Sequence, residues 1–377
     1  MRKIEGRIRL GVVGLGHRGR MLFEMIGKSK NVQAVAACDL NSRLWFEPFR
    51  EEGILAERMK EVKFFEDFET MLKESALDVL LVETPALCHA EFCALAMEYG
   101  VNIFSDIPSV ASLQEAELLW KMQKENPSLL FMTGATTLGW GFAIALQDLY
   151  KQGLLGKISS METEYLHDCR SLWEETPWRK PGKGNLCHPI GYCTHGLGPL
   201  LAILDEELRT VSAFSSGSQV TDIPEAHDYE CAVYQTPSGV IIRQTNSFIN
   251  NWKGGAHTFR VFGSEGAFEH LSARGSRREE TSFSSEKLYC AKKLTPVPIS
   301  YTPHDQEISF GHGGADSYLW FAFEKALLSG AGKAPVDLQA GLRMTLPGIY
   351  AVRSIREGGK KVDIRYPWDP DWKEALK

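Results

Sequence analysis

A glycine-rich turn near the start of the chain constrains its fold more than any other feature. Gly14, Gly16 and Gly19 have the spacing Gly-x-Gly-x-x-Gly within GVVGLGHRG. An apolar β-type run at residues 8–13 precedes them, and a helical pattern follows over residues 18–28. Such glycines permit a tight turn and let the backbone approach a pyrophosphate at the helix N-terminus. The turn therefore predicts a Rossmann-type dinucleotide site formed by Gly14, Leu15, Gly16, His17, Arg18 and Gly19.

An acidic residue follows at the distance that this kind of site requires. Asp39 ends the second β-type run, residues 32–38, and comes 20 residues after Gly19. A carboxylate at this place accepts hydrogen bonds from the adenosine ribose hydroxyls and repels a 2′-phosphate. We therefore expect the cofactor to be NAD rather than NADP.

Strand and helix patterns alternate along the first third of the chain. The predicted strands are residues 8–13, 32–38, 62–65, 78–85, 101–106 and 129–134. Helical patterns at 18–28, 89–99 and 113–125 separate some of them, and Ser112 with Glu115 predicts a capping box before the last. This alternation is typical of a doubly wound parallel sheet.

The pattern changes after a helical stretch at 139–152. Strands are then predicted at 157–168, 208–215, 228–236, 240–249 and 257–262, and helices at 193–204, 316–329 and 338–357. Pro347 predicts a kink or break in the last helix, and the polar residues 272–287 predict a mobile loop. The expected fold class is α/β, with a Rossmann domain over 1–135 and an α+β substrate-binding domain with a mainly antiparallel open sheet over 136–377. Whether the C-terminal helix packs back on the first domain stays open.

The composition fits a soluble protein and argues against two classes of partner. The 377 residues carry a formal net charge of −6. Nucleic acids and anionic membranes need a concentrated basic surface, so neither is expected as a partner. No run approaches the ~20 apolar residues that cross a bilayer, and the opening MRKIEGRIRLGVVG predicts a first strand rather than a signal peptide. Eight scattered cysteines are typical of free thiols in a reducing compartment, so we expect a cytoplasmic location.

The order of motifs in the first domain resembles the glucose–fructose oxidoreductase / inositol dehydrogenase (Gfo/Idh/MocA) superfamily. VETP (82–85) and then His89 follow the glycine turn, and a later strand ends before a proline. The resemblance implies that further NAD contacts come from Thr84, Pro85, His89 and Asp106. Most dehydrogenases of this superfamily carry Glu-Lys-Pro at that proline, and the lysine assists proton removal from the alcohol. This chain has Asp106-Ile107-Pro108, so the lysine is missing.

The chain is most similar to one branch that lacks this lysine, the NAD-dependent α-N-acetylgalactosaminidases of glycoside hydrolase family 109. That branch typically shows Glu-Val-Pro, which DIPS (106–109) resembles. Further matches follow in the same order: QGLLGKI (152–158), YLHDCR (165–170), Trp178-Arg179, GN (184–185), YCTHGLGP (192–199) and GHGGAD (311–316). The resemblance covers most of the chain.

Three departures from the family pattern lie around the expected sugar pocket. LCHPIG (186–191) stands where the family has a single leucine, and the segment from Tyr165 to Trp178 is shorter. Counting back from GLLG without gaps places the family's substrate-binding glutamate on Ala135. These departures bear on the identity of the sugar more than on the chemistry.

The resemblance implies an NAD-dependent glycoside hydrolase with a small-molecule glycoside as substrate. One sugar hydroxyl is oxidised to a ketone, the acidified neighbouring C–H loses its proton, and the aglycone leaves by elimination. Water then adds, and the ketone is reduced again. Such a site needs a base for the hydroxyl, a base for the carbon acid and donors for the developing enolate. The catalytic candidates are His195, His167, Tyr165, Tyr192 and Arg179.

The spacing of these candidates is consistent with one shared site. Tyr165 and His167 are two residues apart on one predicted strand, so both face the same side. Tyr192 and His195 are three residues apart where a helix begins, and they would reach the site from another direction. An imidazole with a pKa of about 6.5 suits reversible proton transfer at neutral pH, and Arg179 can hold a substrate oxygen or carboxylate. Weaker candidates are Tyr301, His304 and His312.

Other interpretations of the sequence stay open. Cys187, His188, Cys193 and His195 carry donor atoms that suit zinc, but their spacing matches no standard zinc pattern, so no metal is expected. The alternative function is a simple NAD-dependent sugar or polyol dehydrogenase that releases NADH. A third is a catalytically silent NAD-binding sensor. We also expect a homo-oligomer that forms through the open face of the second-domain sheet.

Overall fold

The chain folds into two compact units. The computed structural model describes residues 4, 6–46, 59–175, 179–181, 188–250, 256–273, 278–297 and 311–376. The first unit contains Met1–Thr136 and Thr302–Leu342, and the second contains Thr137–Tyr301 and Arg343–Lys377. The sequence predicted a second domain that contains every residue after 135, whereas the described residues 311–342 group with the first unit.

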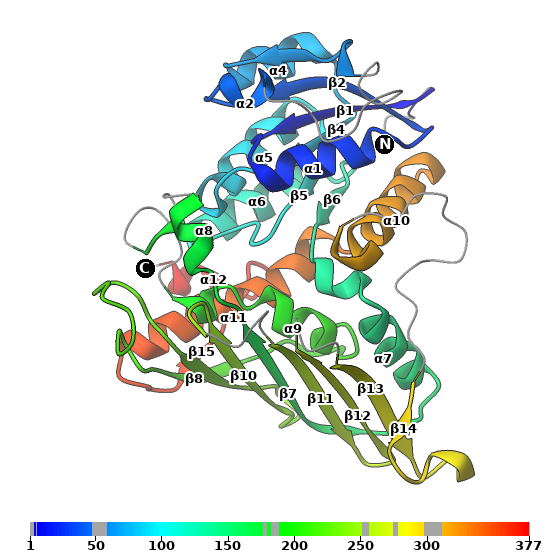
Figure 1. Cartoon of the computed structure of the whole chain (residues 1–377), viewed down its shortest axis with the longest axis vertical. Coiled ribbons are helices and arrows are strands. Elements are labelled where there is room, and N and C mark those ends of the chain that lie inside the picture. Colours follow the sequence, from blue (N-terminus) through cyan, green and yellow to red (C-terminus); the bar gives the residue numbers. More distant parts are fainter. Residues whose placement is uncertain are drawn as a thin grey trace. The chain divides into compact units, whose positions relative to one another are not determined.

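The first unit is built on a six-stranded parallel sheet with the strand order β3-β2-β1-β4-β5-β6 (Figure 1). The strands are β1 (Ile8–Val13), β2 (Val32–Cys38), β3 (Lys63–Phe65), β4 (Val79–Val82), β5 (Asn102–Ser105) and β6 (Phe131–Thr133). Their apolar side chains are buried, as in a sheet that helices cover on both faces. The strand order reverses between β1 and β4, where folds of this kind bind ligands at the carboxyl ends. The predicted Rossmann sheet is confirmed.

Helices join these strands as the alternating pattern predicts. They are α1 (His17–Ile26), α2 (Arg43–Phe46), α4 (Phe68–Ser75), α5 (His89–Glu98) and α6 (Leu113–Glu125). The capping box before α6 is confirmed: Ser112 Oγ accepts a hydrogen bond from Glu115 N at 3.2 Å. The Glu115 carboxylate reaches back and accepts one from Ala111 N at 2.6 Å.

Helix α10 (Ala315–Ser329) belongs to the first unit although it lies far along the chain. Its buried Glu324 accepts hydrogen bonds from Ser29 Oγ at 2.8 Å and from Asn31 Nδ2 at 2.7 Å. The ring of Trp320 lies 5.9 Å from that of Phe104 in β5. The helical period predicted this helix, but a period does not say which core its apolar face packs on.

The second unit contains a nine-stranded sheet with the order β14-β13-β12-β11-β7-β10-β9-β8-β15. The strands are β7 (Ile158–Leu166), β8 (Thr210–Ser215), β9 (Glu230–Gln235), β10 (Ile241–Ser247), β11 (Ala256–Gly263), β12 (Gly266–Ala273), β13 (Arg278–Ser285), β14 (Thr295–Pro296) and β15 (Val362–Asp363). Strands β7 and β10 pair in parallel, and the other pairs are antiparallel. The predicted second domain with a mainly antiparallel sheet is confirmed.

The prediction of a mobile loop at 272–287 is wrong where the structure shows strands. Strand β12 runs to Ala273, and β13 covers Arg278–Ser285. His270 and Thr281 lie opposite each other in this pair, and His270 Nδ1 is 2.8 Å from Thr281 Oγ1. Both residues are buried. A hydrophobicity pattern overlooks β13 because a polar pair fills part of its buried side.

Three helices of the second unit lie on one face of its sheet (Figure 1): α7 (Gly141–Lys151), α9 (Thr194–Leu201) and the part of α11 (Leu338–Arg356) that follows Leu342. The shorter α8 (Arg170–Glu175) and α12 (Trp372–Ala375) also belong to this unit. Phe142 of α7 stacks on His270, with ring centroids 4.0 Å apart. Helix α11 continues through Pro347, so the predicted break does not occur there.

The other face of the nine-stranded sheet carries ion pairs and exposed apolar side chains. Glu162 Oε2 lies 2.9 Å from Arg243 Nη2 and 3.3 Å from Arg260 Nη1. Exposed apolar side chains on this face are Phe214, Val233, Ile241 and Phe262. Self-association through this face stays a prediction.

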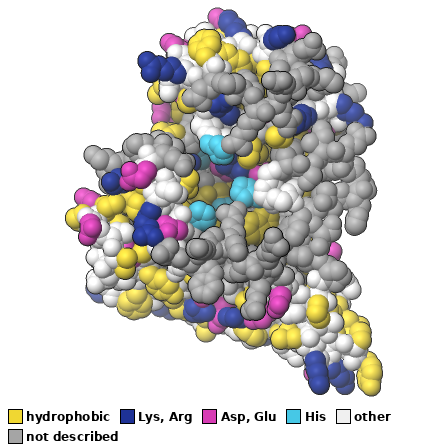
Figure 2. Space-filling view, viewed as in Figure 1, with side chains coloured by type: hydrophobic (Ala, Val, Ile, Leu, Met, Phe, Trp, Pro, Cys, Tyr) yellow, Lys and Arg dark blue, Asp and Glu magenta, His cyan; other side chains and the backbone are white. Residues whose placement is uncertain are grey.

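The surface and the cysteines bear on the predicted partners and location. On the face drawn in Figure 2, basic and acidic side chains are interspersed. The seven cysteines within the described ranges are free thiols, and Cys38, Cys93 and Cys193 are buried. No helix in the described part of the chain is long and apolar enough to cross a membrane. The predicted compartment and the expected absence of nucleic-acid and membrane partners stay predictions.

Candidate functional site

The glycine turn of the first unit has the backbone geometry that a dinucleotide site requires. Gly14 has a φ of +92°, and a Cβ there would lie 2.6 Å from the Glu83 carbonyl. A Cβ on Gly19 would lie 2.0 Å from the Gly14 oxygen. By contrast, a Cβ on Gly16, the N-cap of α1, would meet no described atom within 4 Å. Gly14 and Gly19 thus permit the tight turn, and Gly16 leaves the helix N-terminus open to an anion.

Asp39 lies at the carboxyl end of β2, beside this turn. Its Oδ2 accepts a hydrogen bond from Leu15 N at 2.6 Å, and its Oδ1 accepts one from Asn41 N at 2.8 Å. A carboxylate offers about four acceptor positions, so two remain for ribose hydroxyls. The next residue, Leu40, is 94% exposed.

The turn after β4 carries Thr84 and Pro85. Thr84 Oγ1 is buried and has no hydrogen-bond partner among the described residues, which is unusual unless a ligand supplies one. His89 is buried at the start of α5, after η1 (Ala86–Cys88). Its Nε2 lies 2.6 Å from the Thr84 oxygen and its Nδ1 lies 2.9 Å from the Pro108 oxygen. His89 therefore connects two turns of the predicted cofactor site.

Arg18 is the centre of a charge network in the first unit. Its Nε lies 2.9 Å from Asp106 Oδ2, and its two terminal nitrogens lie 3.1 and 3.2 Å from the oxygens of Asp316. Glu83 Oε2 is 3.7 Å away. Burial disfavours the charged guanidinium, but Asp106, Asp316 and Glu83 outweigh burial and raise the pKa of Arg18 well above its usual value.

Two carboxyl groups of this network have pKa values that shift in opposite directions. Burial and then the charge of Asp106 raise the pKa of Glu83 well above its usual value, which favours its neutral form. Burial acts in the same direction on Asp316, but a hydrogen bond from His312 and the charge of Arg18 hold the pKa of Asp316 well below its usual value. His312 Nδ1 lies 2.9 Å from Asp316 Oδ2.

The sequence analysis predicted Arg18 and Asp106 at the cofactor site but missed their partners Glu83 and Asp316. Both lie in motifs that it had quoted, Glu83 in VETP and Asp316 in GHGGAD. Their acidic side chains within these motifs were a usable signal, but no spacing along the chain links either residue to Arg18.

Ile107 occupies the place of the family's lysine. Its side chain is 4% exposed, and an alkyl group cannot accept a proton. The neighbouring Asp106 is engaged by Arg18. The first unit therefore has no lysine base at this position, but the open helix N-terminus at Gly16, the carboxylate of Asp39 and the buried Thr84 hydroxyl fit NAD.

In the second unit, rings from β7 and the start of α9 lie together. The rings of Tyr165 and His195 are stacked, with centroids 5.0 Å apart and planes at 19°. Tyr192 lies edge-on to His195 at 5.1 Å and is 6.1 Å from Tyr165. All three side chains are half-buried. The predicted approach of Tyr192 and His195 to Tyr165 is confirmed.

His167, the residue directly after β7, extends this group of rings. Its ring lies 6.2 Å from that of Tyr165 with planes at 10°, so the two face the same side as predicted. His167 Nδ1 is 2.9 Å from Cys169 Sγ. Burial raises the pKa of the Cys169 thiol to about 12, and the charge of Arg179 opposes this rise. Arg179 therefore lies near Cys169 and, through it, near His167.

Three further aromatic residues belong to this ring cluster and were missed. His257 of β11 lies opposite Tyr165 in the sheet, and their ring centroids are 4.8 Å apart. Trp140 is edge-on to His257 at 5.0 Å. Phe248 lies 6.3 Å from Tyr165 and 6.0 Å from Tyr192. No motif marks these residues, because strand register and helix packing bring them together.

Gly196 allows α9, which carries His195, to pack closely against the sheet. A Cβ on Gly196 would lie 2.7 Å from Gln244 Nε2 and 3.0 Å from the Thr163 side chain. On the N-terminal side of α9, Asn246 Nδ2 donates hydrogen bonds to the Pro189 oxygen at 2.8 Å and to the Tyr192 oxygen at 3.2 Å. The HGLGP motif is therefore a packing motif as well as a source of His195.

The zinc interpretation of the sequence is not supported by its described members. His195 stacks on Tyr165, the Cys193 thiol donates to the Met344 oxygen at 3.1 Å, and His188 faces Glu230. Ala135, at the place of the family's glutamate, is buried. The residues quoted earlier that lie outside the described ranges are Trp178, Gly184, Asn185, Cys187, Tyr301 and His304.

Two protein-family models match this chain, one in each of its two parts. Residues 8–134 match the oxidoreductase family model with an NAD-binding Rossmann fold. Residues 144–269 match the GFO/IDH/MocA C-terminal domain. Together the two models cover more than half of the chain.

Curated relatives share similarity over nearly the whole length. A glycosyl hydrolase family 109 protein from Solibacter usitatus is 23% identical, over 94% of this chain and 87% of the relative. Glycosyl hydrolase family 109 protein 2 from Akkermansia muciniphila is 27% identical, over 98% of this chain and 85% of the relative.

Solved structures show the same fold. Levoglucosan dehydrogenase in complex with NADH has a TM-score of 0.79 at 18% identity, over 96% of this chain and all (100%) of that one. Myo-inositol 2-dehydrogenase from Lactobacillus plantarum has a TM-score of 0.71 at 16% identity, over 95% of this chain and 100% of that one. At such identities the likeness concerns the fold alone. Because both domain models match in order along one chain, this protein belongs to the GFO/IDH/MocA oxidoreductase family and binds NAD in its Rossmann unit.

Proposed function

We propose that this chain is an NAD-dependent glycoside hydrolase that acts by transient oxidation, elimination, water addition and re-reduction. The observation that carries the proposal is the cluster of Tyr165, Tyr192 and His195 in a chain whose lysine position holds the buried Ile107. Proton transfer then depends on groups of the second unit. The relatives named glycosyl hydrolase family 109 support the same assignment.

The first unit contributes cofactor binding. When bound, NAD supplies a hydride acceptor that later returns the same hydride to the sugar. Gly16 would leave room for the pyrophosphate, and the Asp39 carboxylate would accept hydrogen bonds from the ribose hydroxyls. The ion pairs of Arg18 hold Asp106 in place, so Asp106 is not a proton acceptor in this proposal.

The second unit contributes proton transfer. His195 accepts the hydroxyl proton as the sugar carbon is oxidised, and Tyr165 and Tyr192 hold the oxygen by hydrogen bonds. His167 then removes the proton from the carbon next to the ketone. The bond from the sugar to the aglycone oxygen breaks as a carbon–carbon double bond forms, and His167 passes the proton it has just taken to the departing aglycone oxygen.

The remaining steps reverse the first ones with water in place of the aglycone. As water adds across the double bond, its hydroxyl group bonds to the carbon that carried the aglycone, and His167 takes the remaining water proton and passes it to the neighbouring carbon. His195 returns its proton to the oxygen as the ketone is reduced. Substrate and water become sugar and aglycone, and no net oxidation takes place. Arg179, near Cys169, would hold a substrate oxygen in this scheme.

One assay separates this function from the alternative dehydrogenase. The purified protein is incubated with panels of α- and β-aryl glycosides, and both aglycone release and NADH absorbance are followed. Aglycone release without net NADH supports the hydrolase. Accumulation of NADH with free sugars as substrates would instead indicate a dehydrogenase. If folded, NAD-loaded protein gives neither signal, the result would favour a silent sensor. Both anomers belong in the panel because elimination after oxidation tolerates either.

Hydrolysis in heavy water tests the elimination itself. The product sugar should carry deuterium on the carbon next to the transiently oxidised one, because that proton is exchanged at the base. Mass spectrometry and NMR of the product locate the label. An unlabelled product would contradict elimination and indicate direct displacement.

A further inference from the structure

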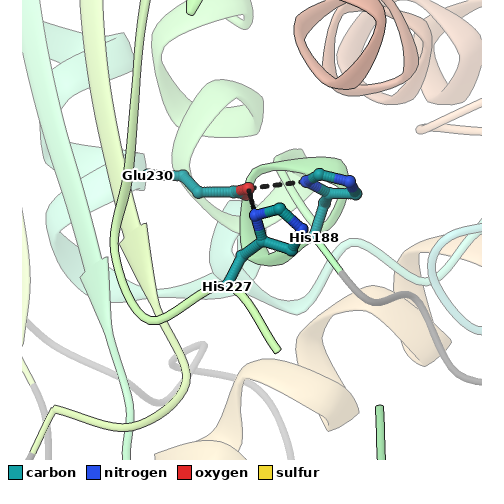
Figure 3. A group of neighbouring side chains, drawn as sticks. All are labelled: His188, His227 and Glu230. Carbon is teal, nitrogen blue, oxygen red and sulfur yellow. Dashed lines mark hydrogen bonds and ion pairs between the residues drawn. The ribbon is translucent and has the colours of Figure 1, made fainter. Parts of the chain in front are cut away.

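Three side chains with metal-binding donor atoms converge in the second unit, apart from the ring cluster around Tyr165. They are His188, His227 and Glu230, whose ligand atoms all lie within 4.8 Å of one another (Figure 3). His188 precedes the short helix η4 (Pro189–Gly191), and Glu230 begins β9. Among the described residues, no other group of three such side chains meets this distance.

Glu230 is the centre of this group. Its side chain is fully buried, and its Oε1 lies 2.6 Å from His188 Nδ1 and 3.3 Å from His227 Nδ1. Its Oε2 accepts a hydrogen bond from Ile190 N at 2.9 Å. Figure 3 shows both rings turning a nitrogen toward one carboxylate oxygen. One oxygen of Glu230 is thus held by the backbone, and the other faces two imidazoles.

The environment of Glu230 calls for a cation. A buried carboxylate is costly unless a positive charge compensates it. Within the described ranges the ion pairs of Glu230 are with His188 and His227 alone, and neither lysine nor arginine contributes one. The two imidazole rings lie 3.8 Å apart with planes at 31°, so two imidazolium charges would repel each other.

Neutral imidazoles are the form that binds metals. Ser215 Oγ lies 2.7 Å from His227 Nδ1 and restrains the orientation of that ring. A divalent cation would compensate the carboxylate without charging either ring.

We propose that His188, His227 and Glu230 bind one divalent transition-metal ion of the zinc class. Two imidazole nitrogens and one carboxylate oxygen are a donor set that Zn²⁺ accepts, with water completing its coordination. This set differs from the one considered in the sequence, which combined His188 with Cys187, Cys193 and His195. His227 and Glu230 come from a distant segment, and spacing along the chain did not indicate them.

The bound ion would anchor the segment that leads to Tyr192 and α9. Ile190 N already donates to Glu230, and Asn246 already holds the Pro189 and Tyr192 oxygens. A metal on His188 would add a third attachment to the same short segment. Its role is to position this segment, so metal binding does not depend on the proposed hydrolase activity.

Zinc binding to the full-length protein tests the proposal. The protein is stripped with a chelator, dialysed and titrated with Zn²⁺, and bound metal is measured after gel filtration. We expect about one zinc per chain and a rise in Tm of about 3 °C or more that the chelator reverses. Glu230→Gln and His227→Ala should each weaken zinc binding at least tenfold. His270→Asn, which changes a buried histidine outside the group, should leave the stoichiometry unchanged.

Cobalt substitution distinguishes this donor set from a cysteine site. Co²⁺ in the stripped protein should give visible d–d absorption without the near-ultraviolet charge-transfer band of a thiolate ligand. A thiolate band would show that cysteine binds the metal and would overturn the proposal. It is equally overturned if stripped wild-type protein retains no stoichiometric zinc at micromolar concentrations, a result that does not require any variant to fold.

Discussion

Arg18 in the first unit and Tyr165 in the second each stand at the centre of a side-chain cluster, but different forces hold the two clusters. Arg18 is fixed by Asp106 and Asp316, and these partners raise the pKa of Arg18 while a hydrogen bond from His312 and the charge of Arg18 lower that of Asp316. Tyr165 is surrounded by rings such as His195 and His257, at 5.0 and 4.8 Å. Ring packing depends on shape, whereas ion pairing depends on charge. The first cluster is therefore held by fixed charges, whereas the second is held by ring packing and contains the histidine and tyrosine side chains proposed to act on the substrate.

Removing the central charge of the first cluster should give the largest effect. Arg18→Met leaves the buried Asp316 and the partly buried Asp106 without their cation, so the free energy of unfolding of the NAD-free protein should fall by about 3–5 kcal/mol. Urea unfolding measures this change. The control is Arg243→Met, which breaks a half-exposed pair with Glu162 and should cost less than about 1 kcal/mol. Equal losses in the two variants would show that charge does not hold the first cluster.

The second cluster should respond in turnover rather than in stability. His195→Ala should reduce turnover on the best glycoside by roughly 10²-fold or more, because a positioned acid–base group contributes about that much. His167→Ala should also reduce turnover by about 10²-fold. NAD binding should survive in both, since neither residue belongs to the Rossmann unit. Steady-state kinetics and cofactor titration separate the two properties.

A structural histidine of the same unit provides the matched control. His270→Asn removes a ring buried against Phe142 and should lower stability while the folded enzyme keeps its turnover. A folded, NAD-loaded His195→Ala protein with near-normal turnover would contradict the proton-transfer role.

The pH dependence of stability should reveal the same structural histidine. Burial lowers the pKa of His270 to about 3. Unfolded histidine binds a proton below about pH 6.5. Between about pH 6 and pH 4 the unfolded chain therefore binds more protons at this residue, and stability falls as the pH falls, by about 1 kcal/mol per pH unit. Urea unfolding at several pH values should show a correspondingly smaller slope in His270→Asn, and an unchanged slope would mean that His270 is not buried as a neutral ring.

The smallest expected effect concerns cofactor choice. Asp39→Ala removes the ribose acceptor and the repulsion of a 2′-phosphate, so the preference for NAD over NADP should fall by about tenfold. Equilibrium titration with both cofactors measures this preference. Asp67→Ala, which removes the exposed N-cap of α4, should affect stability but not selectivity. If Asp39→Ala keeps the full preference, Asp39 does not bind the ribose.

Local patterns accounted for much of the fold and part of the site. The glycine turn and the apolar runs predicted the Rossmann sheet, because each strand and helix leaves its own periodicity in the sequence. The two-residue spacing of Tyr165 and His167 predicted their common side for the same reason. The polar strand β13 was missed because its buried side is partly filled by the pair of His270 and Thr281.

By itself, the sequence determined the parallel sheet, the Gly14-to-Gly19 turn with Asp39, and the common side of Tyr165 and His167 in the second domain. These features depend on backbone conformations and spacings within a few residues or within one recurring motif. Only the tertiary structure decided that α10 joins the first unit, that Asp316 pairs with Arg18, and that Glu230 faces His188. Arg18 and Asp316 are 298 residues apart, and His188 and Glu230 are 42 apart. Such partners meet through packing and strand register, and no local preference of either residue specifies the other.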